Sequence, residues 1–76
     1  MTTHYMTCSF DTQGNRDTFQ ISPFTTLDEA INACLISFNN LTEEQKKVII
    51  KLSVFACTQN CNIITLDNEV WSQMTQ

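Results

Sequence analysis

The chain is poor in the residues that break regular structure and in basic charge. Its 76 residues include one glycine and one proline, which excludes collagen-like, linker-like and low-complexity character. With Gly14 alone, no glycine-rich loop can hold a phosphate group. The chain has four basic and eight acidic residues, and it contains no row of basic residues that could contact a nucleic-acid backbone. We therefore expect no direct binding of nucleic acid.

Long hydrophobic runs and targeting signals are also absent from the sequence. No window approaches the roughly 18 apolar residues of a membrane span, and residues 1–10 lack the basic and apolar segments of a secretory signal. We expect a cytoplasmic protein without a membrane partner, in which cysteines are reduced thiols. The length leaves room for one hydrophobic core, so residues 1–76 are predicted to form a single domain.

Catalytic groups are scarce. His4 is the only histidine, and no G-x-S-x-G nucleophile elbow occurs. The adjacent acids Asp28 and Glu29, like Glu43 and Glu44, fall at predicted helix starts, where the helix dipole favours negative charge. We therefore expect a protein that is not an enzyme and that needs no cofactor.

The first 22 residues have the pattern of a β-hairpin. Gly14 and Asn15 suit a two-residue type II′ turn, with glycine at the position that needs a positive φ. This turn would place residues whose numbers sum to 29 opposite each other. Three apolar pairs then share one face of the hairpin: Phe10 with Phe19, Cys8 with Ile21, and Met6 with Pro23.

Two capping boxes predict two helices. Thr26 with Glu29 opens the first helix, which Asn39 and Asn40 can close, since asparagine tolerates the left-handed conformation. Thr42 with Gln45 opens the second, which is predicted to run on to Cys57 and to end near Cys61. The first helix buries apolar residues at helical spacing, namely Leu27, Ala30, Ile31, Cys34, Leu35 and Phe38.

The second predicted helix is apolar on nearly every side. Val48, Leu52, Phe55 and Ala56 form one apolar stripe, and Ile50, Val54, Cys57 and Cys61 form another. A helix of this kind must be covered on more than one side. The second stripe is therefore predicted to meet a partner or a second copy of the chain.

The C-terminal residues 62–66 are rich in β-formers and predict a third strand. Residues beyond it are predicted either to return as a strand across Asp67 and Asn68, with Trp71 opposite Ile64, or to form a short helix capped by Asp67. The strand is favoured. The predicted fold is thus a small two-layer α+β domain, with an antiparallel sheet packed on two helices, in the order β-β-α-α-β with a possible further strand.

The four cysteines raise the question of a metal site. Structural zinc sites use two close pairs of ligands, but only Cys57 and Cys61 are close here, and Cys8 and Cys34 fall singly on predicted core faces. Core packing is therefore favoured over metal binding. Redox chemistry is disfavoured as well, because the C-terminal end of a helix opposes formation of a thiolate. A metal-stabilised domain that uses these four cysteines, with His4 as a further ligand, remains the alternative.

With catalytic groups missing and apolar surface in excess, the sequence predicts a small acidic protein–protein interaction module. Its partner would be another protein with a basic surface, or a second copy that forms a homodimer. In format it is similar to many phage-encoded inhibitors of host defence, anti-CRISPR proteins among them. A third alternative is a regulator that contacts nucleic acid through Lys46, Lys47 and Lys51. The predicted contact residues are Tyr5, Ile50, Val54, Trp71, Asp11, Asp17, Asp67 and Glu69, although covering a core edge is the favoured role of Tyr5 and Trp71.

Overall fold

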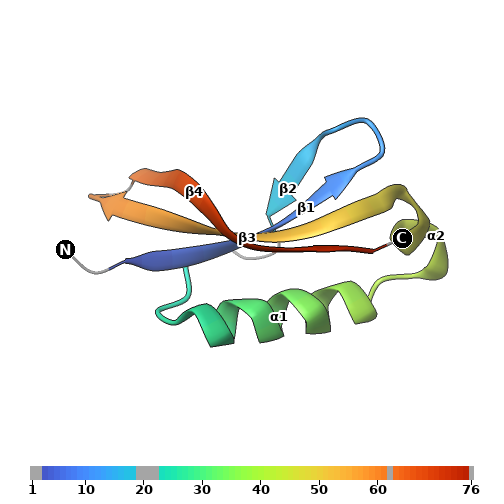
Figure 1. Cartoon of the computed structure of the whole chain (residues 1–76), viewed down its shortest axis with the longest axis horizontal. Coiled ribbons are helices and arrows are strands. Elements are labelled where there is room, and N and C mark those ends of the chain that lie inside the picture. Colours follow the sequence, from blue (N-terminus) through green and yellow to red (C-terminus); the bar gives the residue numbers. More distant parts are fainter. Residues whose placement is uncertain (1–2, 19–22, 62, 76) are drawn as a thin grey trace.

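A computed structural model describes residues 3–18, 23–61 and 63–75. Within them four strands and two helices follow one another in the predicted order β-β-α-α-β-β (Figure 1). The elements are β1 (His4–Asp11), β2 (Arg16–Thr18), α1 (Leu27–Asn39), α2 (Glu43–Val48), β3 (Ile49–Asn60) and β4 (Ile63–Met74). The strands form one antiparallel sheet in the order β2-β1-β3-β4, so β1 and β3 are central.

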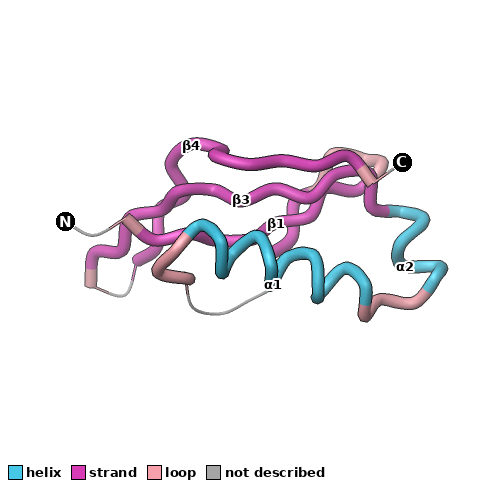
Figure 2. The backbone as a smooth tube through the Cα atoms, turned by 60° about the horizontal axis from the view of Figure 1, so that its bottom comes forward, coloured by secondary structure: helices cyan, strands magenta, loops and turns pink. Residues whose placement is uncertain are grey.

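The molecule has two layers. Helix α1 runs across one face of the sheet and packs on β1 and β3, while α2 lies at the end of the sheet where the C-terminus also lies (Figures 1 and 2). Cys34 of α1 meets Ile49 and Leu52 of β3 in the buried core, which is bordered by Leu35, Phe38, Leu41 and Trp71. The predicted α+β class is confirmed. Neither described helix is long and apolar enough to cross a membrane.

The first turn differs from the two-residue turn that the sequence predicted. Gly14 does adopt a positive φ of 84°, but its N–H donates to the carbonyl of Asp11 at 3.0 Å, and the N–H of Asp11 donates to the carbonyl of Asn15 at 3.1 Å. The loop therefore has three residues. The carboxylate of Asp11 accepts from the N–H groups of Gln13 at 2.8 Å and Asn15 at 2.9 Å, and these bonds hold the longer loop.

This turn changes the register of the hairpin. Cys8 lies opposite Thr18 and Phe10 opposite Arg16, so paired numbers sum to 26 and the predicted sum of 29 is wrong beside the turn. Farther along β1, Tyr5 bridges to Phe24, where the sum is 29. Between these two pairs the chain covers three positions on β1, from Cys8 to Tyr5, and six positions on the second segment, from Thr18 to Phe24. Phe19 and Ile21, two of the predicted partners, lie outside the described residues.

Helix α1 begins and ends where its sequence predicts. The hydroxyl of Thr26 accepts from the N–H of Glu29 at 3.2 Å and donates to the Glu29 carboxylate at 2.9 Å. Asn40 closes the helix with a φ of −84°, in the right-handed and not the left-handed region. Ala30 and Cys34 are its buried residues.

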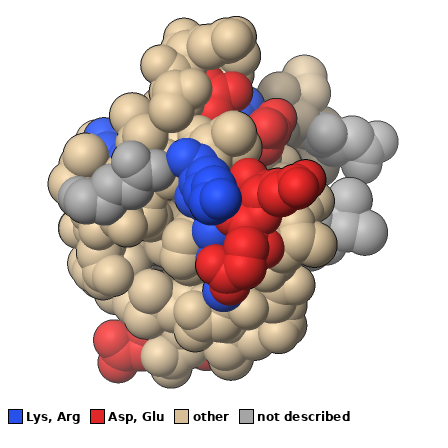
Figure 3. Space-filling view, turned by 90° about the vertical axis from the view of Figure 1, so that its right-hand side faces the viewer, with Lys and Arg blue, Asp and Glu red and all other residues tan. Residues whose placement is uncertain are grey.

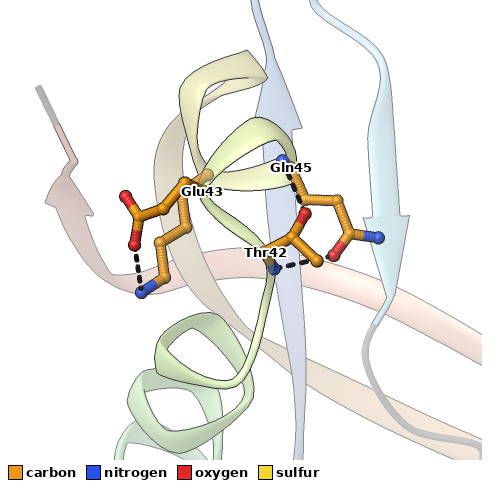
Figure 4. Close-up of polar contacts among 4 residues, drawn as sticks. Thr42, Glu43 and Gln45 are labelled. Carbon is orange, nitrogen blue, oxygen red and sulfur yellow. Dashed lines mark hydrogen bonds and ion pairs between the residues drawn. The ribbon is translucent and has the colours of Figure 1, made fainter.

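The second helix is much shorter than predicted. Its capping box is present, with Thr42 and Gln45 bonded to each other in both directions (Figure 4), but α2 ends at Val48. Residues 49–60 form the central strand β3, so the prediction of a helix up to Cys57 is wrong. An apolar run fits a buried helix and a strand that is covered on both faces equally well. Residues 49–60 form a strand and not a helix because β1 and β4 pair with them along both edges.

The C-terminal segment is one long strand. β4 pairs with β3 from Lys51 opposite Met74 to Asn60 opposite Ile63, and the chain reverses directly after β3, where Cys61 has a φ of 57°. The predicted reversal at Asp67 and Asn68 is therefore wrong, as is the alternative short helix. Trp71 lies opposite Val54 and not opposite Ile64. Since β3 begins twelve residues before the reversal, β4 has a partner over its full length.

Candidate functional site

The outer edge of β4 is a long unpaired strand edge. β4 has twelve residues and pairs only with β3, whereas the strand at the opposite edge, β2, has three residues (Figure 2). Within the described part of the chain, no segment pairs with the outer N–H and C=O groups of β4. A row of this kind is a template for pairing with another strand.

Exposed apolar side chains concentrate on the same strand. Of five large hydrophobic residues that are exposed in the described chain, three belong to β4, namely Ile63, Val70 and Met74; the other two are Ile36 and Val48. Ile63 is 69% exposed and Met74 61%. β4 contains no lysine, arginine or proline, the residues that natural proteins place on edge strands to prevent pairing. The β4 edge therefore lacks protection by a cation or a proline.

Two bulges divide β4 into two regular arms. Val54 lies opposite Trp71 but Phe55 lies opposite Glu69, so Val70 is an extra residue. A second extra residue falls between Glu69 and Leu66, before Cys57 pairs with Leu66. Bulges bend a strand and interrupt pairing along its edge. This leaves an N-terminal arm (residues 63–66) and a C-terminal arm (residues 71–74) on which a further strand can pair.

Two acids lie in the bulged middle of β4, and their surroundings differ. Glu69 accepts a hydrogen bond from the hydroxyl of Ser53 at 2.6 Å and lies 3.0 Å from the ammonium of Lys51. These two contacts, the Ser53 bond first, lower the pKa of Glu69 below its ordinary value of 4.5. Asp67 accepts a hydrogen bond from Thr58 at 2.8 Å, and no ion pair to it occurs among the described residues. The charge of Asp67 is therefore not neutralised within the described chain.

Replacing Ser53 with alanine is expected to raise the pKa of Glu69 in the folded chain. The present, lowered pKa means that this contact stabilises the fold above pH 4.5, and that the stabilisation is lost as the pH falls through the folded-state pKa. An NMR titration of the Glu69 carboxyl carbon measures the folded-state pKa. Ser72 is exposed on β4 and lies directly opposite Ser53. Ser72→Ala is therefore the matched control and should leave the titration of Glu69 unchanged. An unchanged pKa in Ser53→Ala would contradict the assignment.

The predicted apolar contact residues are less accessible than the sequence suggested. Val54 is fully buried in β3, so its side chain is not exposed to a partner in the folded chain. Ile50 is half-buried beside the bulge between β1 and β3, and its carbonyl accepts from the N–H of Thr75 at 3.0 Å. Trp71 is half-buried against the core, and Tyr5 is half-buried where β1 bridges to Phe24. Both aromatic residues thus border packed structure.

The four predicted acids do not form one patch. Asp11 holds the first turn and Asp17 is exposed on β2, while Asp67 and Glu69 lie on β4 at the opposite edge of the sheet. On the face shown in Figure 3, acidic side chains adjoin basic side chains, so charges of both signs lie side by side there. Asp17 lies on the short edge strand β2, and only the β4 acids lie on the long open edge.

The lysines of the nucleic-acid alternative are partly occupied by other contacts. Lys46 lies 3.8 Å from Glu43 (Figure 4) and 5.8 Å from the ring centre of Phe38, and Lys51 pairs with Glu69. These contacts reduce the positive potential that a phosphate backbone would meet.

Two contacts between a cation and an aromatic ring lie on the sheet face away from α1, and the sequence did not predict them. The guanidinium of Arg16 lies 5.3 Å from the ring centre of Phe55, and the ammonium of Lys51 lies 4.8 Å from that of Phe10. The two rings are 6.4 Å apart. The signal was available as a period of two in residues 51–57, where Leu52 and Val54 alternate with Lys51, Ser53 and Phe55, but it was interpreted as two helical stripes.

The cysteines do not assemble into a metal centre. Cys8, Cys34 and Cys57 are buried and Cys61 is exposed, and the described residues contain no group of three or more His, Cys, Asp or Glu that could hold a metal ion. Burial, with a smaller effect from Cys8, raises the pKa of Cys34 to about 11, and burial raises the pKa of Cys8 and Cys57 as well. These three thiols are therefore poor nucleophiles at neutral pH.

No pocket for a small molecule opens on the surface that the described residues form. The β4 edge, with Ile63, Asp67, Val70 and Met74, is the surface feature best suited to a ligand, and that ligand would be another polypeptide strand. No family model, curated protein or solved structure matches the chain.

Proposed function

We propose that this chain is a non-enzymatic protein–protein interaction module that binds an extended strand of another protein along β4. The observation that carries the proposal is the twelve-residue unpaired edge with three exposed apolar side chains and no protecting lysine or proline. By occupying a segment of a larger protein, such a module would act as an inhibitor or an adaptor without chemistry of its own.

The sheet edge suits this role better than the other surfaces do. Backbone groups on an edge strand supply affinity for any extended segment, and the side chains on the strand supply specificity. The face beneath α1 is buried, and the rings of Phe10 and Phe55 on the opposite face are already covered in part by Lys51 and Arg16. β4 is the one long strand with a free side among those described.

A displayed library of random linear peptides, selected against the immobilised chain, tests the proposal. We expect the selected peptides to protect amides of β4 from hydrogen exchange and to bind Ile63→Lys at least tenfold more weakly. The introduced lysine supplies the edge cation that β4 lacks and removes an apolar contact.

Ile36→Lys is the matched control. Ile36 is an isoleucine of similar exposure, 60% against 69% for Ile63, but it lies on α1. Peptide binding should survive this change. If no peptide is selected, or if selected peptides protect α1 and leave β4 unprotected, the proposed function is wrong.

A further inference from the structure

We infer that the strand bound at β4 is basic: an extended segment that pairs with the N-terminal arm and places a lysine or arginine beside Asp67. This inference rests on the proposed function, and it names the chemistry of the partner at the same edge. It follows from three features of β4, namely its charge, its bulges and the exposure of Ile63.

The charge on β4 is of one sign. Its twelve residues include Asp67 and Glu69 and no cation. Lys51 of β3 already neutralises Glu69 at 3.0 Å, whereas Asp67 has only the hydroxyl of Thr58 as a partner in the described chain. A strand that approaches this edge therefore meets one uncompensated negative charge. A cation on that strand beside Asp67 stabilises the complex, and an anion there destabilises it.

The bulges leave two arms that can be paired, and the N-terminal arm is the one that adjoins Asp67 and carries Ile63. An added strand needs a regular row of backbone groups, and residues 67–70 interrupt that row. The N-terminal arm (residues 63–66) is regular, ends directly at Asp67 and carries Ile63, the most exposed large hydrophobic residue of the described chain. An arm of four residues makes few backbone bonds, so its selectivity must come from side chains at its ends, one apolar and one acidic.

Charge also disfavours a second copy of the chain as the occupant. Each copy carries a net charge of −4, and two β4 strands would bring two uncompensated Asp67 carboxylates to one interface without a cation from either strand. The bulges prevent two such strands from pairing along their full length. A basic segment of another protein faces neither obstacle.

Three fluorescein-labelled ten-residue peptides test the inference. They share an alternating threonine–valine sequence and differ at one central position, which is lysine, glutamine or glutamate. Fluorescence anisotropy gives their dissociation constants for the intact chain at low and high salt. We expect the lysine peptide to bind roughly two- to fivefold more tightly than the glutamine peptide, the range of an exposed ion pair, and the glutamate peptide to bind most weakly. Salt should reduce these differences.

Asp67→Asn should abolish the preference for lysine while it keeps an acceptor for the hydroxyl of Thr58. Asp28→Asn, an exposed acid in the first turn of α1, is the control and should retain the preference. Equal binding of all three peptides, or a preference that survives Asp67→Asn, would overturn the inference but leave the proposed function standing. A stable dimer in light scattering that Ile63→Lys dissociates would also overturn it, because a second copy would then cover the edge. If no peptide binds at any charge and no dimer forms, both the inference and the proposed function are wrong.

Discussion

Leu52→Ala is expected to lower the free energy of unfolding by about 3 to 5 kcal/mol, the usual cost of removing a fully buried leucine side chain. Leu52 of β3 is 1% exposed and belongs to the buried cluster with Cys34 of α1, against which Trp71 of β4 packs. A domain of this length has a total stability of roughly 4 to 11 kcal/mol. The substitution therefore removes a large part of what holds the chain folded.

Urea unfolding followed by far-ultraviolet circular dichroism measures the effect of Leu52→Ala as a lower midpoint. Ile36→Ala is the control, since Ile36 is 60% exposed and the change should alter stability by no more than about 0.5 kcal/mol. Equal midpoints for the two variants would mean that β3 does not form the core against α1.

The parts of the fold that the sequence predicts well depend on neighbouring residues. A cap joins side chains three positions apart, so Thr26 with Glu29 and Thr42 with Gln45 locate both helix starts without any knowledge of the rest of the chain. The positive φ of Gly14 is equally local. The α+β class followed from such signals and from the strand patterns, whereas β3 lies where a helix was predicted and the predicted strand at residues 62–66 is part of β4.

The identity of β3 depends on partners that are distant in the sequence. Residues 49–57 are apolar enough for a buried helix, and their alternation becomes decisive only when β1 and β4 pair along both edges. The error then spread to the C-terminal segment, because a helix up to Cys57 leaves no twelve-residue partner for β4. The register of the first hairpin failed for a smaller reason, the hydrogen bonds from the Asp11 side chain that favour a three-residue loop.

The candidate site could be predicted only in part for the same reason. Asp67 and Glu69 were among the predicted contact residues, and both lie on the strand with the open edge. The edge itself is a property of strand order, which no pattern within β4 reveals. Val54 was assigned to the surface because helical geometry separated it from Leu52, whereas alternation along a strand places the two side chains on the same face of the sheet.

Val54→Asp distinguishes these two assignments most sharply. A contact residue on an exposed stripe would tolerate the change, but Val54 is 0% exposed, opposite Thr7 on β1 and Trp71 on β4. An unpaired carboxylate at this position is expected to cost more than about 4 kcal/mol, which unfolds most of the population at pH 7 if the total stability lies near the low end of its range. Circular dichroism and one-dimensional NMR should then show the loss of folded signal.

The pH dependence of the Val54→Asp variant identifies burial of the charge as the cause. Burial favours the neutral form of the introduced carboxyl group, so its pKa is higher in the folded than in the unfolded chain, and the destabilisation lessens as the pH falls. Val54→Asn has a similar size and polarity but does not titrate, so it should show no such recovery relative to the unsubstituted chain. If both variants are as stable as the unsubstituted protein at pH 7, Val54 lies at the surface and the central position of β3 is wrong.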